Sequence, residues 1–324
     1  MKKILTGRER PAPETETVDV GRRRAMQCLA WSGAAIVWTV AGGVPRALGM
    51  AADGKTLDAA RDQFTFVQIS DTHIGFNKEA NPDVTGSLRR AIADVNALPV
   101  TPVFAVHTGD ITHLSRPEQF DTAEQLLREM RTGSMHFVPG EHDALDNGLG
   151  GYLKRYGKGT GGKAYYSFDT HGVHLIGLSN VENFKPGGLA MLGEEQLAWL
   201  ERDVAGLADS TPIVLLAHIP LWSVYEPWGW GTGDAPRAMA ALRRFGSVTV
   251  LNGHIHQVMQ KVEGNVAFHT AMSTAFPQPK PGEAPSPGPL KVPAADLGKV
   301  LGTRTIHVVP GSRLLATVDT PLDH

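Results

Sequence analysis

Five short apolar runs of this chain each end in polar side chains that can bind ions, and this pattern constrains the fold most strongly. The runs read as buried strands at 64–70, 102–110, 135–140, 212–220 and 248–256. Stretches with apolar residues at helical spacing separate several of them. Alternation of strands and helices predicts an α/β layered fold in which helices cover a sheet. Ligands of such folds bind beyond the carboxyl ends of the strands, so we expect one site at that edge.

Other segments complete the layered pattern. Apolar residues at helical spacing predict helices at 87–98, 116–131 and 193–207. Further apolar runs predict a hairpin of strands at 164–180 and strands near the C-terminus at 304–309 and 313–320. The Pro-rich segment 276–293 reads as a surface loop inside the same domain, because predicted strands follow it.

The first 49 residues do not share this pattern. A basic cluster of Arg22, Arg23 and Arg24 precedes a long apolar run, and small residues follow. This order predicts a bacterial export signal, and the consecutive arginines favour the twin-arginine route. We therefore expect residues 1–49 to be cleaved and the product to be periplasmic or otherwise exported. An uncleaved membrane anchor is the alternative, and the cleaved bond, around residues 49 to 52, cannot be identified.

Removal of that segment changes the chemistry available to the remaining domain, residues 50–324. The formal net charge is −2 for the whole chain, and loss of eight basic and four acidic side chains makes it −6. An acidic balance argues against nucleic acid as a partner, and we expect no stable membrane partner after cleavage. The only cysteine, Cys28, lies in the segment that is removed. Any metal chemistry must therefore use histidine and carboxylate ligands.

Candidate ligands follow each of the five predicted strands. Taken singly, each has an ordinary explanation as a turn residue or a core histidine. Their occurrence in order, each at a strand end, indicates a metal site instead. The side chains concerned are Asp71 and His73, Asp110, Glu141 and His142, His218, and the pair His254 and His256.

Five segments together resemble the motifs of the calcineurin-like metallophosphoesterases, which include purple acid phosphatases and class III cyclic nucleotide phosphodiesterases. They read SDTHIG, HTGDIT, PGEHD, LLAHIP and NGHIHQ, and the resemblance spans roughly residues 64 to 275. It implies a four-layer α/β/β/α sandwich of two mixed sheets with helices outside. It also implies a dinuclear metal centre at the edge of the sheets, built from divalent or mixed-valence ions such as Mn, Fe or Zn.

The same resemblance assigns roles to individual residues. His142 stands near the leaving group, and Asp143 orients it. The expected reaction is hydrolysis of small phosphomonoesters or phosphodiesters by a metal-bridging hydroxide. The ligands carried over are Asp71, His73 and His256 for one ion, Asp110 for both, and His218, His254 and Glu141 for the other.

Two positions depart from the family pattern. The family normally has Asn where this chain has Glu141, so a carboxylate replaces a neutral amide. Either Glu141 is a true ligand that changes metal or substrate preference, or its side chain swings away and weakens the second site. In purple acid phosphatases a Tyr follows the bridging Asp by three residues, whereas this chain has His113. We therefore expect no purple chromophore, and His113 is an extra ligand, a support for the ligands or a surface residue.

The alternative to an enzyme is a metal-binding or phosphate-binding protein on the same fold, with catalysis weakened by Glu141. Turnover of a generic ester distinguishes the two. The aromatic residues Trp222, Tyr225, Trp228 and Trp230, which follow His218 along the chain, either pack in the core or line the substrate pocket.

Overall fold

The computed structural model describes residues 35–41, 44–50, 63–146, 148–182, 184–309 and 315–323. It divides into two units, residues 1–61 and 62–324. In the first unit, β1 (Ala35–Ala41) and β2 (Val44–Met50) form an antiparallel pair. The rest of the expected export signal, with its three arginines, lies outside the described residues.

Among the described residues, no helix is both long enough and apolar enough to cross a membrane.

The second unit contains two mixed sheets. In the six-stranded sheet the order is β10 (Met259–Glu263), β11 (Val266–Thr270), β9 (Val248–Asn252), β8 (Ile213–Leu216), β7 (Val173–Gly177) and β6 (Tyr166–Thr170). In the five-stranded sheet it is β13 (Ala316–Pro321), β12 (Gly302–Val308), β3 (Phe64–Ile69), β4 (Phe104–His107) and β5 (Met135–Phe137). Strands β7, β8, β9 and β11 are parallel in the first sheet, and β3, β4 and β5 in the second.

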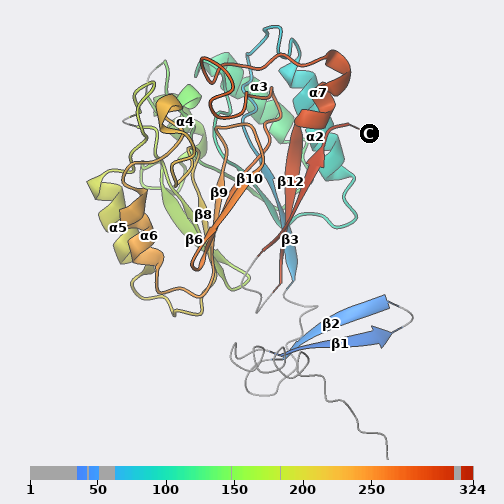
Figure 1. Ribbon diagram of the computed structural model, residues 1–324, viewed down its shortest axis with the longest axis vertical. Helices are drawn as coiled ribbons and strands as arrows, with labels where there is room; N and C mark the ends of the chain where they lie inside the picture. Colours follow the sequence, from blue (N-terminus) through green and yellow to red (C-terminus); the bar gives the residue numbers. More distant parts are fainter. Residues whose placement is uncertain are drawn as a thin grey trace, which may run out of the picture. The chain divides into compact units, whose positions relative to one another are not determined.

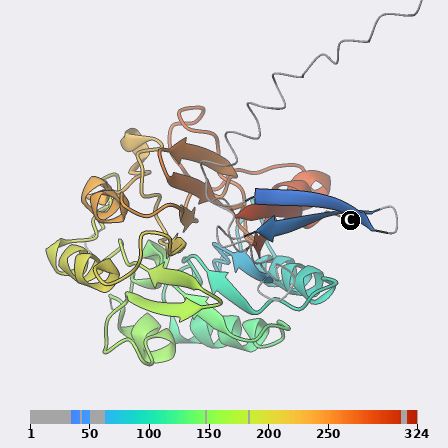
Figure 2. The same cartoon turned by 90° about the horizontal axis from the view of Figure 1, so that it is seen from below.

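Helices cover the outer faces of both sheets, as Figure 1 and the view from below in Figure 2 show. On the five-stranded sheet lie α2 (Val84–Asn96) and α3 (Pro117–Leu127), with α4 (Gly150–Tyr156) beside α3. On the six-stranded sheet lie α5 (Glu194–Val204) and α6 (Ala235–Leu242). A last helix, α7 (Ala294–Val300), contacts β13. This arrangement confirms the four-layer α/β/β/α sandwich.

Side-chain alternation along the strands builds the three hydrophobic cores between these layers. In β3, Val67 and Ile69 pack toward the helices, whereas Phe64 and Phe66 face the opposite sheet. Strand β8 follows the same rule, with Val214 and Leu216 facing β3 and its neighbours. Strands buried on both faces read as continuous apolar runs, which explains why the sequence revealed them.

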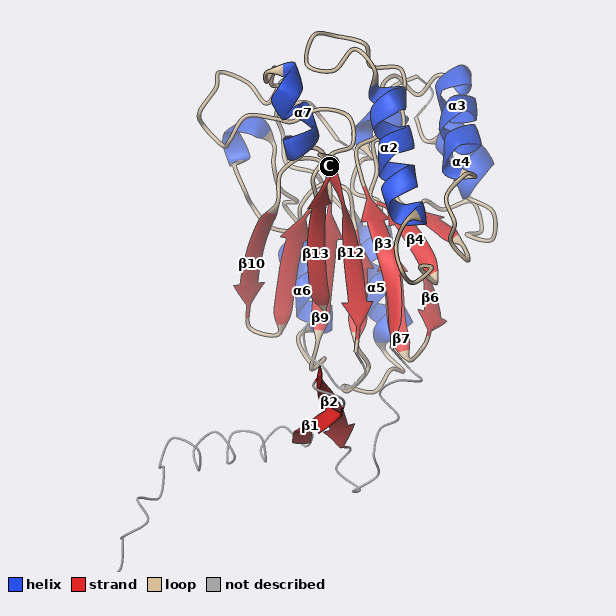
Figure 3. Ribbon diagram, turned by 90° about the vertical axis from the view of Figure 1, so that its right-hand side faces the viewer, coloured by secondary structure: helices blue, strands red, loops and turns tan. Residues whose placement is uncertain are grey.

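The orientation of the strands brings the polar loops of both sheets to one edge. In Figure 3, β10 and β12 point downward, and each is antiparallel to its neighbour in the sheet. The parallel strands of both sheets therefore end at the upper edge of that view. This is the edge at which the sequence placed the candidate ligands.

The predicted strands and helices are present, and the segment 276–293 contains neither helix nor strand, in agreement with the expected loop. The sequence did not predict α4, α6, α7 or the hairpin of β10 and β11. Strand β10 is an edge strand whose side chains are mostly exposed, so it has no apolar run. The three missed helices are only seven or eight residues long, too short for a clear helical period.

The ion pairs of the buried residue His174 should make the stability of the folded protein depend on pH. Nδ1 of His174 in β7 lies 2.8 Å from Asp169 Oδ1, and Nε2 lies 2.9 Å from Asp203 Oδ2. Burial alone would lower the pKa of this imidazole, but the two carboxylates outweigh it and raise the pKa above its ordinary value. The two ion pairs of His174 therefore stabilise the folded protein fully below about pH 6.5, the ordinary pKa of histidine. This stabilisation is lost as the pH rises through the raised pKa of His174.

We expect His174→Gln to reduce the free energy of unfolding by about 1 kcal/mol at pH 5.5 and by less at pH 8.5, measured by urea denaturation. His136→Gln is the matched control, because burial lowers the pKa of His136. The stability that His136 contributes is present at high pH and lost as the pH falls, so its substitution should show the opposite trend. Equal losses at both pH values for His174→Gln would contradict the ion pairs.

Candidate metal centre

Side chains from both sheets meet at this edge. The loops after β3, β4 and β5 bring Asp71, His73, Asp110 and Glu141 from the five-stranded sheet. The loops after β8 and β9 bring His218, His254 and His256 from the six-stranded sheet. Ligand atoms of these seven residues form three overlapping groups, each small enough to surround a metal ion. The structure thus brings together every ligand proposed from the sequence.

The first group consists of Asp71, His73 and His256. His256 Nε2 lies 3.2 Å from Asp71 Oδ1 and 3.3 Å from His73 Nε2. All three side chains are at most 2% exposed. Two imidazole nitrogens facing a carboxylate oxygen at these distances form the donor set of a divalent ion.

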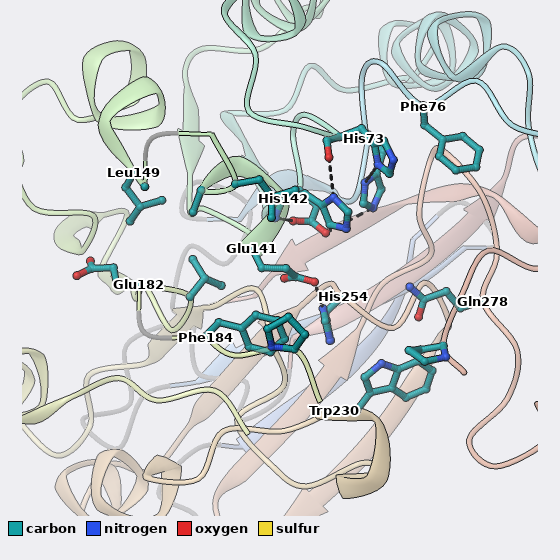
Figure 4. Close-up of a pocket in the computed structure, with 18 of the residues that line it drawn as sticks. His73, Phe76, Glu141, His142, Leu149, Glu182, Phe184, Trp230, His254 and Gln278 are labelled. Carbon is teal, nitrogen blue, oxygen red and sulfur yellow. Dashed lines mark hydrogen bonds and ion pairs between the residues drawn. The ribbon is translucent and has the colours of Figure 1, made fainter. Parts of the chain in front are cut away.

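The second group is centred on Glu141. Its Oε2 lies 3.0 Å from His218 Nε2, and its Oε1 lies 3.0 Å from His254 Nδ1. The carboxylate therefore points into the cluster and not away from it, as Figure 4 also shows for Glu141 and His254. Burial would raise the pKa of Glu141, but the two facing imidazoles outweigh it and hold that pKa well below the usual range.

Asp110 lies between the two groups. Its Oδ2 is 3.4 Å from His73 Nε2 and 3.4 Å from His218 Nε2, so one oxygen faces a ligand of each group. The other oxygen, Oδ1, accepts a hydrogen bond of 2.9 Å from the His142 backbone N–H. This geometry suits a carboxylate that bridges two ions.

Hydrogen bonds orient the rings of His218 and His256 for metal binding. His218 Nδ1 donates to the Thr108 carbonyl at 2.7 Å, and His256 Nδ1 donates to the Phe276 carbonyl at 2.5 Å. Carbonyl oxygens only accept, so each Nδ1 carries a proton and each Nε2 faces the cluster, where its lone pair could bind a metal ion. His218 Nε2 and Glu141 Oε2 are buried and face each other at 3.0 Å, with no other hydrogen-bond partner. Buried polar atoms without partners are uncommon, and bound cations would satisfy both.

Backbone strain is concentrated at the same residues. Five of the seven ligands have a left-handed backbone, a conformation that residues other than glycine seldom adopt. Their φ angles are 55° for Asp71, 39° for His73, 53° for Asp110, 70° for His254 and 53° for His256. Each such residue costs about 1–2 kcal/mol, so the surrounding fold must hold these loops in place.

The structure gives His142 and Asp143 different surroundings from those expected. His142 Nδ1 donates to the His113 carbonyl at 2.7 Å, so His113 and not Asp143 orients the ring. The Asp143 carboxylate instead accepts backbone hydrogen bonds from Gly140, Ile111 and Thr112 at 2.9–3.1 Å. Asp143 therefore ties the loops after β4 and β5 together, because a fully buried carboxylate takes the partners within its reach.

Two further histidines lie close to the ligands. The ring of His113 stacks on His142 with centroids 4.9 Å apart, and its Nδ1 lies 3.4 Å from His73 Nδ1. It contacts the outer nitrogen of His73 and is only partly buried. The ring nitrogens of His73, His113 and His142 also lie close enough together to hold an ion. His107 is fully buried, its Nε2 lies 3.1 Å from Thr72 Oγ1, and burial lowers its pKa to about 3. His107 thus belongs to the core beneath the site.

A cavity of about 850 Å³ opens over the cluster. Trp228 and Trp230 line it, whereas Trp222 packs on Phe268 elsewhere. The Pro-rich loop contributes Phe276, Gln278 and Pro287 to the lining. Leu149 and Phe184, which Figure 4 labels, form an apolar wall of the cavity together with Val181. The sequence did not predict this wall, because apolar residues in loops show no periodicity.

Comparisons with known proteins agree with this geometry. A sequence model described as calcineurin-like phosphoesterase matches residues 64–258. The chain is 26% identical over 227 residues to a probable glycerophosphodiester phosphodiesterase GpdQ of Arcobacter nitrofigilis, covering 64% of this chain and 77% of that protein. It is 26% identical over 224 residues to the glycerophosphodiester phosphodiesterase GpdQ of Enterobacter lignolyticus, covering 65% and 77%.

Solved structures share the fold. A dimetal phosphatase from Danio rerio superimposes with a TM-score of 0.57 at 15% identity, covering 79% of this chain and 98% of that one. A purple acid phosphatase from yellow lupin (Lupinus luteus) seeds superimposes with a TM-score of 0.55 at 14% identity, covering 85% and 56%. At these identities the likeness shows the two-sheet sandwich alone.

The strained backbone predicts an unusual order of stabilities in the metal-free protein. His254 has a left-handed backbone, so His254→Gly should be more stable than His254→Ala by about 1 kcal/mol. His218 has no positive φ, and there the alanine variant should be the more stable one. Urea denaturation in the presence of a chelator measures all four variants. The same order at both positions would show that the strain at His254 is absent.

Proposed function

The chain belongs to the calcineurin-like phosphoesterase family and is a metal-dependent phosphoester hydrolase, and we propose that it is an exported dinuclear phosphodiesterase. When bound, two divalent ions would activate water as the nucleophile and neutralise the attacking and departing oxygens. The residues that would hold them are Asp71, His73 and His256 for one ion, Glu141, His218 and His254 for the other, and Asp110 for both.

His142 would act on the leaving group. Its Nδ1 is bound to the His113 carbonyl, so its Nε2 is the atom that presents a proton to the departing oxygen. The ring lies edge-on to His73, with centroids 4.7 Å apart, and lines the cavity. A histidine held between the ligands and the open space can meet the ester oxygen of a bound substrate.

Glu141 carries the preference for diesters. Three carboxylates on two divalent ions leave one unit of formal positive charge, whereas the amide usual in the family would leave two. A phosphodiester carries one negative charge, and a phosphomonoester carries nearly two at neutral pH. The lower positive charge of the metal centre therefore weakens its attraction for the monoester more than its attraction for the diester. The position of Glu141 between His218 and His254 is the observation on which this proposal rests.

The cavity has room for the second substituent of a diester. Its apolar and aromatic lining includes Leu149, Phe184 and Trp228, and Gln278 adds an amide. Cavities of this size accommodate small organic ligands. The two similar GpdQ proteins are both named as glycerophosphodiester phosphodiesterases, which supports a diester substrate here.

Removal of the Glu141 charge tests the proposal. We expect Glu141→Asn to shift the ratio of kcat/KM for bis(p-nitrophenyl) phosphate over p-nitrophenyl phosphate about tenfold toward the monoester. Glu141→Gln, which removes the charge and keeps the length, should shift it in the same direction. An unchanged ratio in both variants, each loaded with two ions, would refute the charge argument. Metal uptake by the wild type without turnover of either ester would favour the binding-protein alternative.

We also propose that the protein is exported by the twin-arginine route, on the strength of Arg22, Arg23 and Arg24 before the apolar run. Replacement of Arg22, Arg23 and Arg24 by lysine should keep the full-length precursor in the cytoplasm of a bacterial host, measured by fractionation and immunoblotting. Replacement of Arg8 and Arg10, which lie outside the cluster, should leave export unchanged. Normal export of the first variant would exclude this route.

A further inference from the structure

The space between the two sheets changes from apolar to polar directly beneath the metal centre. Phe64 and Phe66 of β3 face the opposite sheet and belong to an apolar core. Two residues further on, Gln68 continues the same face, and Ser70 follows at the strand end. Both are fully buried, as is Arg304 of β12, which pairs with Gln68 across the sheet.

Arg304 places a permanent charge in this layer. Its guanidinium forms two hydrogen bonds with Asp319, from Nε to Oδ1 at 2.9 Å and from Nη2 to Oδ2 at 3.1 Å. Nη2 also donates to the Thr270 carbonyl at 2.8 Å. Burial of an ion pair gains little stability over apolar residues of the same size. Stability alone therefore gives no reason for a charged side chain at this position.

The remaining nitrogen of Arg304 begins a chain of hydrogen bonds that ends on a metal ligand. Nη1 donates to Gln68 Oε1 at 3.3 Å, and Gln68 Nε2 donates to Thr108 Oγ1 at 3.0 Å. Thr108 Oγ1 donates to Ser70 Oγ at 2.6 Å, and Ser70 Oγ donates to Asp71 Oδ2 at 2.5 Å. Every member donates in the same direction, from the guanidinium toward the carboxylate. We call these five residues the Arg304 relay.

Donors aligned in one direction polarise one another, and the effect is strongest in a dry interior. All five members of the relay are fully buried. The relay therefore directs its positive end at Asp71 Oδ2. Together with the His254 backbone N–H, which lies 3.1 Å from Oδ1 and 3.2 Å from Oδ2, it holds the rotation of that carboxylate. Oδ1 is left toward the cluster, 3.2 Å from His256 Nε2.

We propose that Arg304 is a positioning residue for the metal centre, acting through Gln68, Thr108 and Ser70 to hold Asp71 ready for its ion. The inference rests on the proposed metal-binding role of Asp71. Partners of metal ligands outside the coordination sphere commonly change metal affinity 10- to 100-fold when removed. Because the relay reaches Asp71 and not Glu141, its loss should weaken one of the two ions selectively.

The test breaks the relay at its centre and leaves the ligands in place. Full-length protein is stripped with a chelator and titrated calorimetrically with Mn²⁺. The binding step that a His256→Ala variant loses identifies the ion held by Asp71. We expect Thr108→Val to weaken that step at least tenfold and to leave the other step within about threefold. Thr108→Ser keeps the hydroxyl and should restore wild-type affinity.

Two further variants distinguish the loss of the Arg304 relay from a non-specific effect on the fold. Thr249→Val makes the same change at a buried position of β9 outside the relay, and it should leave both steps unchanged. Gln68→Met interrupts the relay one step earlier, with a side chain of similar volume. Combined with Thr108→Val, it should add no further loss, because the path is already broken.

Two results would overturn the proposal. One is a Thr108→Val variant whose Mn²⁺ affinities match those of Thr249→Val. The other is additive losses in the double variant, which would show that Gln68 and Thr108 act separately. Neither result depends on diester hydrolysis, so the relay is tested apart from the proposed substrate.

Discussion

Three carboxylates share one small buried space in this protein, and they can coexist only if positive charge compensates them. Asp71 is fully buried, Asp110 is 2% exposed and the Glu141 side chain is 15% exposed. Four imidazoles face them, and the Nδ1 atoms of two of these donate to backbone carbonyls, so that their Nε2 atoms point inward. An imidazole that gives its Nε2 lone pair to a metal ion is neutral, so two divalent ions would then supply the positive charge that balances the three carboxylates. The need to balance these negative charges explains why the site is suited to two metal ions.

The fold meets the requirement by bringing two sheets to one edge. Asp71 and Asp110 come from one sheet and His218 and His254 from the other, so a dinuclear site needs both sheets in register. The apolar core between the sheets, with Phe66 and its neighbours, fixes that register. Strained backbone at five ligands shows that the loops are held by their surroundings and not by local preference.

The sequence predicted the site better than its surroundings, for physical reasons. Strand-end polar residues such as Asp71 and His218 follow clear apolar runs, so their convergence could be inferred from the topology of α/β sheets. The orientation of His142 could not, since its partner is a backbone carbonyl of His113 and carries no residue signature. Arg304 sits in a predicted strand, yet only the pairing with Gln68 across the sheet reveals that it points inward. Contacts that depend on strand register or on loop backbone atoms can be found only from the structure, not from the sequence.

We propose that the cluster holds two ions and that hydrolysis of a phosphodiester needs both. The most direct test of this proposal is metal content per chain by mass spectrometry, followed in parallel with bis(p-nitrophenyl) phosphate turnover as metal-free protein is reloaded with Mn²⁺. We expect a final content of two ions per chain, with turnover rising as the second ion binds. Saturation at one ion, or two ions without turnover, would contradict it.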